Sequence, residues 1–363
     1  MKYTLLPIFI LVIILSTGCV EYIADTPPSD SLRNKKQEEI FYQYHRNYLN
    51  EEKKKLYDII YQGVINLKRE IPLTCNEQTL SEIILMICND HPELFWLNTK
   101  YEYSITKEGV LFYPDYSYTS EQIAEIQTSI DIEVQSIIKT VQSLNTDYEK
   151  ILFLYDWIID ETEYIDKTKN NQNMISVLSD RQAVCAGYSE ALKYLLDQSA
   201  IPNGIILVKA KENTDEFHVI NLVQLDQEWY YFDPTFGDTK VEKDFEVYRY
   251  TYFAMTSTEV EKIYIPQQEY IQTQAYKDNY FYRNNRYLDT YNKADFISLL
   301  QDSLVNNEPC IAIKCSDAKE YDLIKDIIQS NQIFDFFHTI DYYPNKIQYY
   351  LADETNSIFF SYK

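Results

Sequence analysis

Cys185, near the middle of the chain, has the residue type and setting needed for thiol chemistry. It opens the segment Val184 to Gln198, whose apolar residues recur at helical spacing, so we expect it in the first turn of a buried helix. Unpaired backbone N–H groups and the positive end of the helix dipole favour a thiolate over a thiol at that position. A thiolate held there is suited to attack on a carbonyl carbon.

His218 and Asp233 lie in two strand-like runs joined at Asp226-Gln227. A two-residue loop places Ile220 opposite Asp233, and a four-residue loop gives the same register. Side chains alternate across a strand, so His218 and Asp233 share a face as diagonal neighbours, roughly 6–8 Å apart at Cβ. A carboxylate buried among aromatic residues needs a partner, and the spacing predicts that this partner is the imidazole.

These residues together predict a thiol acyl-transfer site. Cys185 is the nucleophile, His218 takes and returns the proton, and Asp233 fixes the imidazole tautomer. The backbone N–H of Cys185 is the natural first donor to an oxyanion, and we predict Gln182 as the second. The other three histidines, which have no carboxylate at hairpin spacing, are expected to be packing or surface residues: His45, His91 and His338.

Three sequence blocks resemble the transglutaminase-like superfamily. They are VCAGYS at 184–189, HVINLV at 218–223 and WYYFDPT at 229–235, with Ala183 and Ile220 departing from the usual pattern. The resemblance implies an α+β fold with a papain/transglutaminase-like core, in which the Cys lies at a helix N-terminus packed on an antiparallel sheet that carries the His and the Asp. It also implies a Cys185–His218–Asp233 triad.

The N-terminus is typical of an export signal. Lys2 precedes an apolar stretch, Leu5 to Leu15, which is too short to cross a bilayer as a helix. Ser16-Thr17-Gly18-Cys19 follows and resembles the bacterial lipoprotein box, with Ser16 where Leu is usual. We therefore expect lipidation at Cys19 and an extracytoplasmic protein anchored to the cell membrane; the alternative is an ordinary signal peptide with a chance Cys.

Composition excludes some partners. The net charge is −23 and the pI is about 4.6, so nucleic acid would be repelled.

Metal-binding motifs are absent and there are only 6 Gly, so we expect no metal and no cofactor. Cys310 and Cys315 lie in one strand-like run, too far apart to form a disulfide. The expected partner is a protein or peptide substrate at the cell envelope.

Periodicity and capping signals predict a long helix over 37–70, a helix over Gln78–Cys88, a hairpin over Tyr101–Tyr113, and helices opened by capping boxes at Thr119 and Thr146. The tyrosine-rich runs at 248–253 and 280–287 favour ordinary packing over sugar stacking. The predicted organisation is a lipoprotein-type signal peptide at 1–19, a tether at 20–36, a mostly helical region at 37–145, the transglutaminase-like core at 146–260, an aromatic-rich connector at 261–291 and a small α/β region at 292–363.

Two classes of function remain open at this point. The favoured one is an enzyme that forms an acyl-thioester at Cys185, with hydrolysis slightly preferred over transfer to an amine. The other is a surface module that keeps the fold for binding without catalysis.

Overall fold

The computed structural model describes residues 42–165, 172–241 and 243–363 of the 363-residue chain. The chain forms two compact units. The first comprises the described residues up to Ile206 together with 215–224, and the second comprises 207–214 together with the described residues from 225 to 363. Cys19 and the predicted signal and tether lie outside the described residues.

The helix predicted over 37–70 is wrong in one respect, because two helices occupy the described part of that range. Helix α1 covers Tyr44–Asn47 and α2 covers Glu51–Ile65. Asn50 has extended backbone angles and accepts a hydrogen bond from the Lys53 N–H (2.9 Å), so it caps α2. Residues 37–41 lie outside the described residues.

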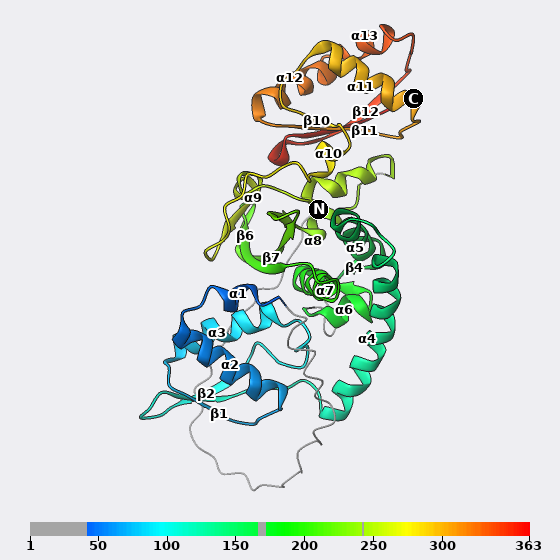
Figure 1. Cartoon of the computed structure of the whole chain (residues 1–363). Helices are drawn as coiled ribbons and strands as arrows, with labels where there is room; N and C mark the ends of the chain where they lie inside the picture. Colours follow the sequence, from blue (N-terminus) through cyan, green and yellow to red (C-terminus); the bar gives the residue numbers. More distant parts are fainter. Residues whose placement is uncertain (1–41, 166–171, 242) are drawn as a thin grey trace. The chain divides into compact units, whose positions relative to one another are not determined.

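The N-terminal part of the first unit also contains a sheet. The predicted hairpin is confirmed as β2 (Glu102–Ile105) and β3 (Val110–Tyr113), and β1 (Ile71–Leu73), which was not predicted, pairs with β3. Gly109 turns the hairpin at φ +147°, where a Cβ would lie 2.2 Å from the Leu73 carbonyl oxygen. Helices α2 and α3 (Glu77–Asp90) bury their apolar faces against this sheet (Figure 1).

Both predicted capping boxes are confirmed. Thr119 and Gln122 cap α4 (Ser120–Val141), and Thr146 and Glu149 cap α5 (Asp147–Glu161). Each Thr hydroxyl accepts from the N3 backbone N–H while the N3 side chain accepts from the cap residue, which satisfies donors that the first turn leaves free. The next helices are α6 (Met174–Leu178) and α7 (Cys185–Gln198), which pack together.

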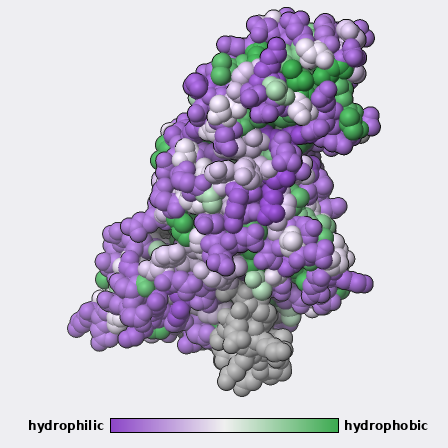
Figure 2. Space-filling view, turned by 45° about the horizontal axis from the view of Figure 1, so that its top comes forward, coloured by the Kyte–Doolittle hydropathy of each residue, from purple (hydrophilic) through white to green (hydrophobic). Residues whose placement is uncertain are grey.

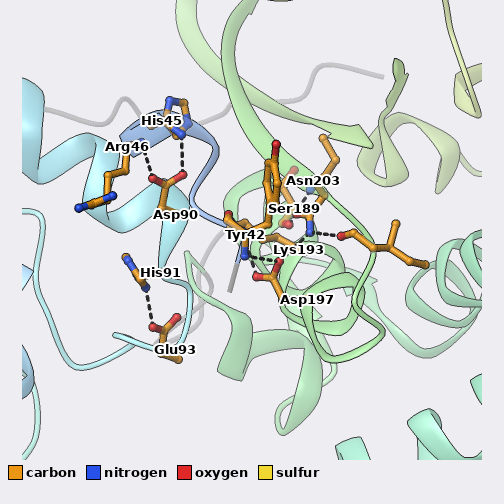
Figure 3. Close-up of polar contacts among 12 residues, drawn as sticks. Tyr42, His45, Arg46, Asp90, His91, Glu93, Ser189, Lys193, Asp197 and Asn203 are labelled. Carbon is orange, nitrogen blue, oxygen red and sulfur yellow. Dashed lines mark hydrogen bonds and ion pairs between the residues drawn. The ribbon is translucent and has the colours of Figure 1, made fainter. Parts of the chain in front are cut away.

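A buried polar cluster holds the start of the described chain in place, and we call it the N-terminal clamp (Figure 3). It consists of Tyr42, His45, Asp90, Lys193 and Asp197. Asp90 accepts from the His45 N–H (2.9 Å), while Asp197 accepts from the Tyr42 N–H (3.2 Å) and pairs with Lys193 (2.9 Å). Lys193 also donates to the Tyr42 carbonyl (3.0 Å). The clamp therefore fixes this segment against α3 and the C-terminal half of α7.

A four-stranded sheet with the order β8-β7-β6-β9 carries the predicted catalytic strands. The two strand-like runs joined at Asp226-Gln227 are confirmed as β7 and β8, and Asp233 lies just after β8, where it caps a short helix, α8 (Pro234–Gly237). The strands are β6 (Asn203–Ala210), β7 (Asn213–Leu225), β8 (Glu228–Phe232) and β9 (Tyr264–Pro266). A shorter parallel pair joins β4 (Glu163–Tyr164) to β5 (Gln182–Ala183).

The C-terminal part of the second unit is an α/β layer with its own apolar core. Its sheet has the order β10-β11-β13-β12, and α11 and α12 lie on one side of it (Figure 1). The predicted strand-like run that carries Cys310 and Cys315 is confirmed as β11. The elements are β10 (Tyr287–Leu288), α11 (Lys293–Val305), β11 (Ile311–Cys315), α12 (Ala318–Gln329), α13 (Ile333–His338), β12 (Ile347–Ala352), η3 (Asp353–Thr355) and β13 (Ser357–Tyr362).

The tyrosine-rich runs pack against other aromatic rings, as predicted. Tyr250 stacks on Tyr280 with ring centroids 3.8 Å apart, and Tyr248 contacts Phe359 edge-on at 5.5 Å. In the second unit, the first run begins in η2 (Lys243–Tyr252) and the helix α9 (Ser257–Ile263) follows it. The second run begins in α10 (Tyr280–Arg283).

Hydrophilic residues cover most of the face drawn in Figure 2, in line with the high net charge. Within the described ranges, no helix is both long and apolar enough to span a membrane.

Candidate active site

Cys185 is the first residue of α7, as predicted, and its side chain is buried. Val184 occupies the N-cap with extended backbone angles, and its apolar side chain offers no acceptor to the first-turn N–H groups. Those donors and the helix dipole therefore act on whatever anion lies at the start of the helix.

The segment that precedes Cys185 is held in place by strand pairing and by the contacts of Arg181. Strand β5 pairs in parallel with β4, so that Gln182 lies opposite Glu163. Arg181, which precedes β5, has a φ of 57°, donates to Glu133 (2.7 Å) and lies over the Trp157 ring at 4.7 Å. This places Gln182 three residues before Cys185 on a short strand, and its role as an oxyanion donor stays a prediction.

Two buried hydrogen bonds join α7 to the strand that carries His218. The Ser189 hydroxyl donates to the Val219 carbonyl (3.1 Å), and the Asn221 amide donates to the Ser189 carbonyl (2.9 Å). Strand carbonyls lie near the plane of the sheet, so Ser189 meets β7 at its edge. Because residues four apart lie on one helix face, Cys185 is one turn, about 6 Å, from this junction. His218 is the neighbour of Val219.

Asp233 is fully buried at the end of β8 in the second unit. Its two carboxylate oxygens each accept a hydrogen bond: Oδ1 from the Phe236 N–H (3.0 Å) and Oδ2 from the Tyr264 hydroxyl (2.5 Å). The backbone is held as well, because the Asp233 N–H donates to the Tyr252 carbonyl (3.0 Å). These contacts compensate the burial of a carboxylate and fix its orientation.

The turn before β8 has the length on which the register argument depends. Strand β7 ends at Leu225 and β8 begins at Glu228, so the turn consists of Asp226 and Gln227. Their φ values are 51° and 70°. Positive φ at both central residues is the type I′ conformation of a two-residue hairpin, which pairs Leu225 with Glu228.

The predicted site residues thus fall on both units. Cys185, Gln182 and His218 belong to the first unit, and Asp233 belongs to the second. The structure fixes the local setting of each, and the assignment of catalytic roles stays a proposal.

Sequence reasoning missed three residues that hold the site: Ser189, Asn221 and Tyr264. Ser189 carried a usable signal, because it lies one helical turn after Cys185 in an otherwise apolar stretch. Asn221 is a polar residue inside a buried strand, which also signals a specific partner. No local signal marks Tyr264, since it is one of 35 tyrosines and lies 31 residues from Asp233.

The other histidines have structural settings, as predicted. His45 is buried and its Nε2 lies 2.9 Å from the Ile205 carbonyl oxygen, and burial lowers the pKa of its imidazole. His91 contacts Glu93 (2.7 Å) and stacks on the Tyr61 ring. His338 stacks on Tyr343.

The five cysteines of the described ranges are free thiols, so the expected lack of a disulfide between Cys310 and Cys315 is confirmed. Burial raises the pKa of Cys88 and that of Cys315 to about 12 each. Both groups are therefore protonated at neutral pH and poor nucleophiles. Over the same described ranges, no three His, Cys, Asp or Glu side chains gather in a way that would hold a metal ion.

Comparison with known families agrees with the sequence blocks. Residues 135–234 match the family described as the transglutaminase-like superfamily. The chain carries a transglutaminase-like domain. The matched segment begins in α4, includes Cys185 and His218, and ends one residue after Asp233. This domain is of mixed α+β class, as predicted.

Solved structures align with parts of the chain at low identity and low TM-score. One is a TGase, with 13% identity, 39% of this chain and 45% of that chain covered, and a TM-score of 0.28. A protein from Cytophaga hutchinsonii, described as a candidate cysteine protease, has 21% identity, 33% and 43% coverage and a TM-score of 0.27. The periplasmic domain of TgpA from Pseudomonas aeruginosa has 17% identity, 36% and 57% coverage and a TM-score of 0.25.

The matched part spans less than half of the TGase and of the Cytophaga protein. Among proteins with curated descriptions, no sequence matches the chain.

Proposed function

We propose that the protein is an extracytoplasmic thiol enzyme that cleaves or transfers amide bonds of a protein or envelope peptide through an acyl-thioester at Cys185. The observation that carries this proposal is the pair of buried hydrogen bonds between Ser189 and β7. They hold the start of the nucleophile helix beside the residue that follows His218. A nucleophilic thiol and its general base must lie close to each other in the fold.

The type I′ turn supports Asp233 as the third member. Pairing of Leu225 with Glu228 sets Ile220 opposite Asp233 along the hairpin, and His218 then projects from the same face as Asp233. In the proposed triad the carboxylate accepts a hydrogen bond from one imidazole nitrogen. The other nitrogen is then free to act on the Cys185 sulfur.

The chemistry follows from these roles. The Cys185 thiolate attacks the amide carbon, and the oxyanion that forms accepts hydrogen bonds from the Cys185 N–H and from Gln182. His218, protonated by the thiol, passes that proton to the leaving amine as the C–N bond breaks and the thioester remains. Water then attacks the thioester, with His218 as the base, and releases the acid and the thiol. An amine in place of water gives transfer instead of hydrolysis, and we favour hydrolysis.

We place this enzyme outside the cytoplasm on the strength of the N-terminal sequence. The apolar stretch followed by Ser-Thr-Gly-Cys supports export and lipidation at Cys19. A lipid anchor and a tether would keep the catalytic domain near the envelope peptides that we propose as substrates.

Labelling with iodoacetamide at pH 7, followed by peptide mapping, tests the proposal. We expect Cys185 to be modified well before Cys88 and Cys315, whose raised pKa values keep them protonated. Heat unfolding should remove this preference. Equal labelling of all thiols in the folded protein would contradict the enzyme and favour a surface module that has kept the fold without catalysis.

A further inference from the structure

The Tyr264 hydroxyl donates a 2.5 Å hydrogen bond to Oδ2 of Asp233, and both side chains are buried in the second unit. Tyr264 comes from β9, outside the segment 135–234 that matches the family. The contact therefore joins the end of that segment to a strand supplied by the region that follows it.

The backbone and the ring of Tyr264 are both fixed. On β9 it pairs with Ala210 of β6, and the ring lies against Phe236 with centroids 5.7 Å apart. The Phe236 N–H is the donor to the other oxygen of Asp233. One residue thus packs against Tyr264 and also holds the carboxylate, so that the phenol and the N–H approach Asp233 from defined directions.

We propose that Tyr264 is a positioning residue of the active site, which holds Asp233 turned toward His218. This inference rests on the proposed function, because it assigns Asp233 to the triad. A buried carboxylate with one donor on each oxygen cannot rotate without losing a hydrogen bond. Loss of the Tyr264 donor removes one of the hydrogen bonds that fix the orientation of the carboxylate. A carboxylate turned away from His218 no longer stabilises the imidazolium that the Cys185 thiolate needs.

The second unit offers a matched control in Tyr230. Its side chain is also fully buried, and its hydroxyl donates to a carboxylate, Oδ2 of Asp278, at 2.9 Å. Tyr230→Phe therefore removes the same group from the same kind of contact, but at a carboxylate that has no place in the proposed triad.

The experiment measures the rate at which iodoacetamide alkylates Cys185 between pH 5 and pH 9 in the full chain. The proteins compared are the wild type, Tyr264→Phe, Tyr230→Phe, Asp233→Asn and the double variant Tyr264→Phe/Asp233→Asn. In Tyr264→Phe the acidic limb of the profile should move to higher pH by about one unit, since hydrogen bonds to charged groups are among the strong ones. The rate at neutral pH should fall several-fold.

Tyr230→Phe should keep the wild-type profile, and Tyr264→Phe should add nothing in the Asp233→Asn background. Titratable groups that act on Asp233 from packed elements include Tyr264 of β9 and Tyr252 of η2. Burial raises the pKa of Tyr252 well above its ordinary value, so it stays neutral across the range.

Three results distinguish a failure of the proposed function from a failure of the proposed role of Tyr264. If Cys185 of the wild type reacts no faster than in the unfolded chain, the proposed function is wrong. If Cys185 reacts fast and depends on His218, but the Tyr264→Phe profile equals that of the wild type, the role of Tyr264 is wrong and the function stands. If Tyr264→Phe shifts the profile equally with and without Asp233→Asn, Tyr264 acts on general structure rather than through Asp233.

Should Tyr264→Phe fail to fold, replacement of Tyr264 by 3-fluorotyrosine keeps the shape and the donor. Its more acidic phenol donates more strongly, so the acidic limb should move to lower pH. An unchanged profile in that variant would overturn the proposal.

Discussion

At the residue scale, thiols and carboxylates of the same type lie in different local environments in this protein. Cys185 lies at a helix start, whereas burial raises the pKa of Cys88 and Cys315. Asp233 accepts a donor on each oxygen. The chemistry therefore depends on local environment rather than on residue type, because buried examples of the same types elsewhere in the chain have other contacts.

Cys185→Ala should abolish acyl transfer on any substrate that the wild type accepts, because the nucleophile is lost. Cys315→Ala is the matched control, since it removes a buried thiol from β11 and should leave the activity unchanged. The measurement is turnover of a peptide substrate once one is found. Activity that survived Cys185→Ala would rule out the thioester.

Asp233→Asn should keep the fold and slow the reaction by up to about 10⁴-fold, the loss expected when the imidazole adopts the wrong tautomer. The amide retains an acceptor for the Phe236 N–H, so circular dichroism and the unfolding midpoint should change little. A variant with wild-type turnover would show that Asp233 is only the cap of α8.

At the element scale, the helix–strand junction and the N-terminal clamp hold α7 at its two ends. Ser189 joins its first half to β7. Lys193 and Asp197 join its second half to the segment at Tyr42 (Figure 3). The orientation of the nucleophile helix is therefore set by buried polar contacts as well as by apolar packing.

Lys193→Met should destabilise the protein by about 3–5 kcal/mol at pH 8, because it leaves Asp197 buried without its partner. In the wild type, burial raises the pKa of Asp197 to about 6, and Lys193 opposes this rise. Without Lys193 the pKa rises further. A raised carboxyl pKa means that the folded state binds more protons than the unfolded state, so stability falls as pH rises through that window. The variant should therefore regain stability, relative to the wild type, between pH 8 and pH 5.

Urea unfolding at several pH values measures this difference. Burial, and to a smaller degree the charge of Lys193, lowers the pKa of His45. Loss of Lys193 eases this lowering, so the change at His45 also favours the variant as pH falls. Lys53→Met is the control, because Lys53 pairs with Glu82 at 2.8 Å on the surface. It should cost no more than about 1 kcal/mol. A loss in Lys193→Met that does not vary with pH would contradict the linkage.

The elements show what the sequence does and does not specify. Capping residues and periodicity predicted α3, α4, α5 and α7, because those signals are local. Asn50 also carried a local signal, but the apolar spacing on both sides of it suggested one continuous helix. Strand β1 has three residues and is stabilised by pairing with β3, a contact that no local pattern reveals.

The site residues likewise fall into those that the sequence pattern predicts and those whose contacts it does not reveal. Residue types and spacing single out Cys185, His218 and Asp233 as the proposed nucleophile, base and orienting acid. The contacts of Ser189 and Tyr264 depend on tertiary structure and could not be predicted.

At the scale of the whole molecule, the family match covers 135–234, and the described chain continues well beyond it on both sides. The C-terminal α/β layer has its own core, and the segment before it supplies Tyr264. The predicted domain boundaries, including the catalytic core over 146–260, stay predictions.

Location is a property of the whole chain. Wild-type protein expressed with its own N-terminus should partition into detergent, and Cys19→Ser should partition into the aqueous phase, because the lipid attachment site is lost. Cys75→Ser, at another cysteine of the chain, is the control and should behave as the wild type. Equal partitioning of Cys19→Ser and the wild type would end the lipoprotein proposal.

The most direct test of the central claim is the rate at which iodoacetamide alkylates Cys185 at pH 6 in wild type and in His218→Ala. At this pH a free thiol is almost wholly protonated, whereas a thiolate paired with an imidazolium is not. We predict that His218→Ala slows the alkylation of Cys185 at least tenfold, while His338→Ala, which alters a ring stacked on Tyr343, leaves the rate unchanged. Equal rates in wild type and His218→Ala would contradict the Cys185–His218 pair and with it the proposed enzyme.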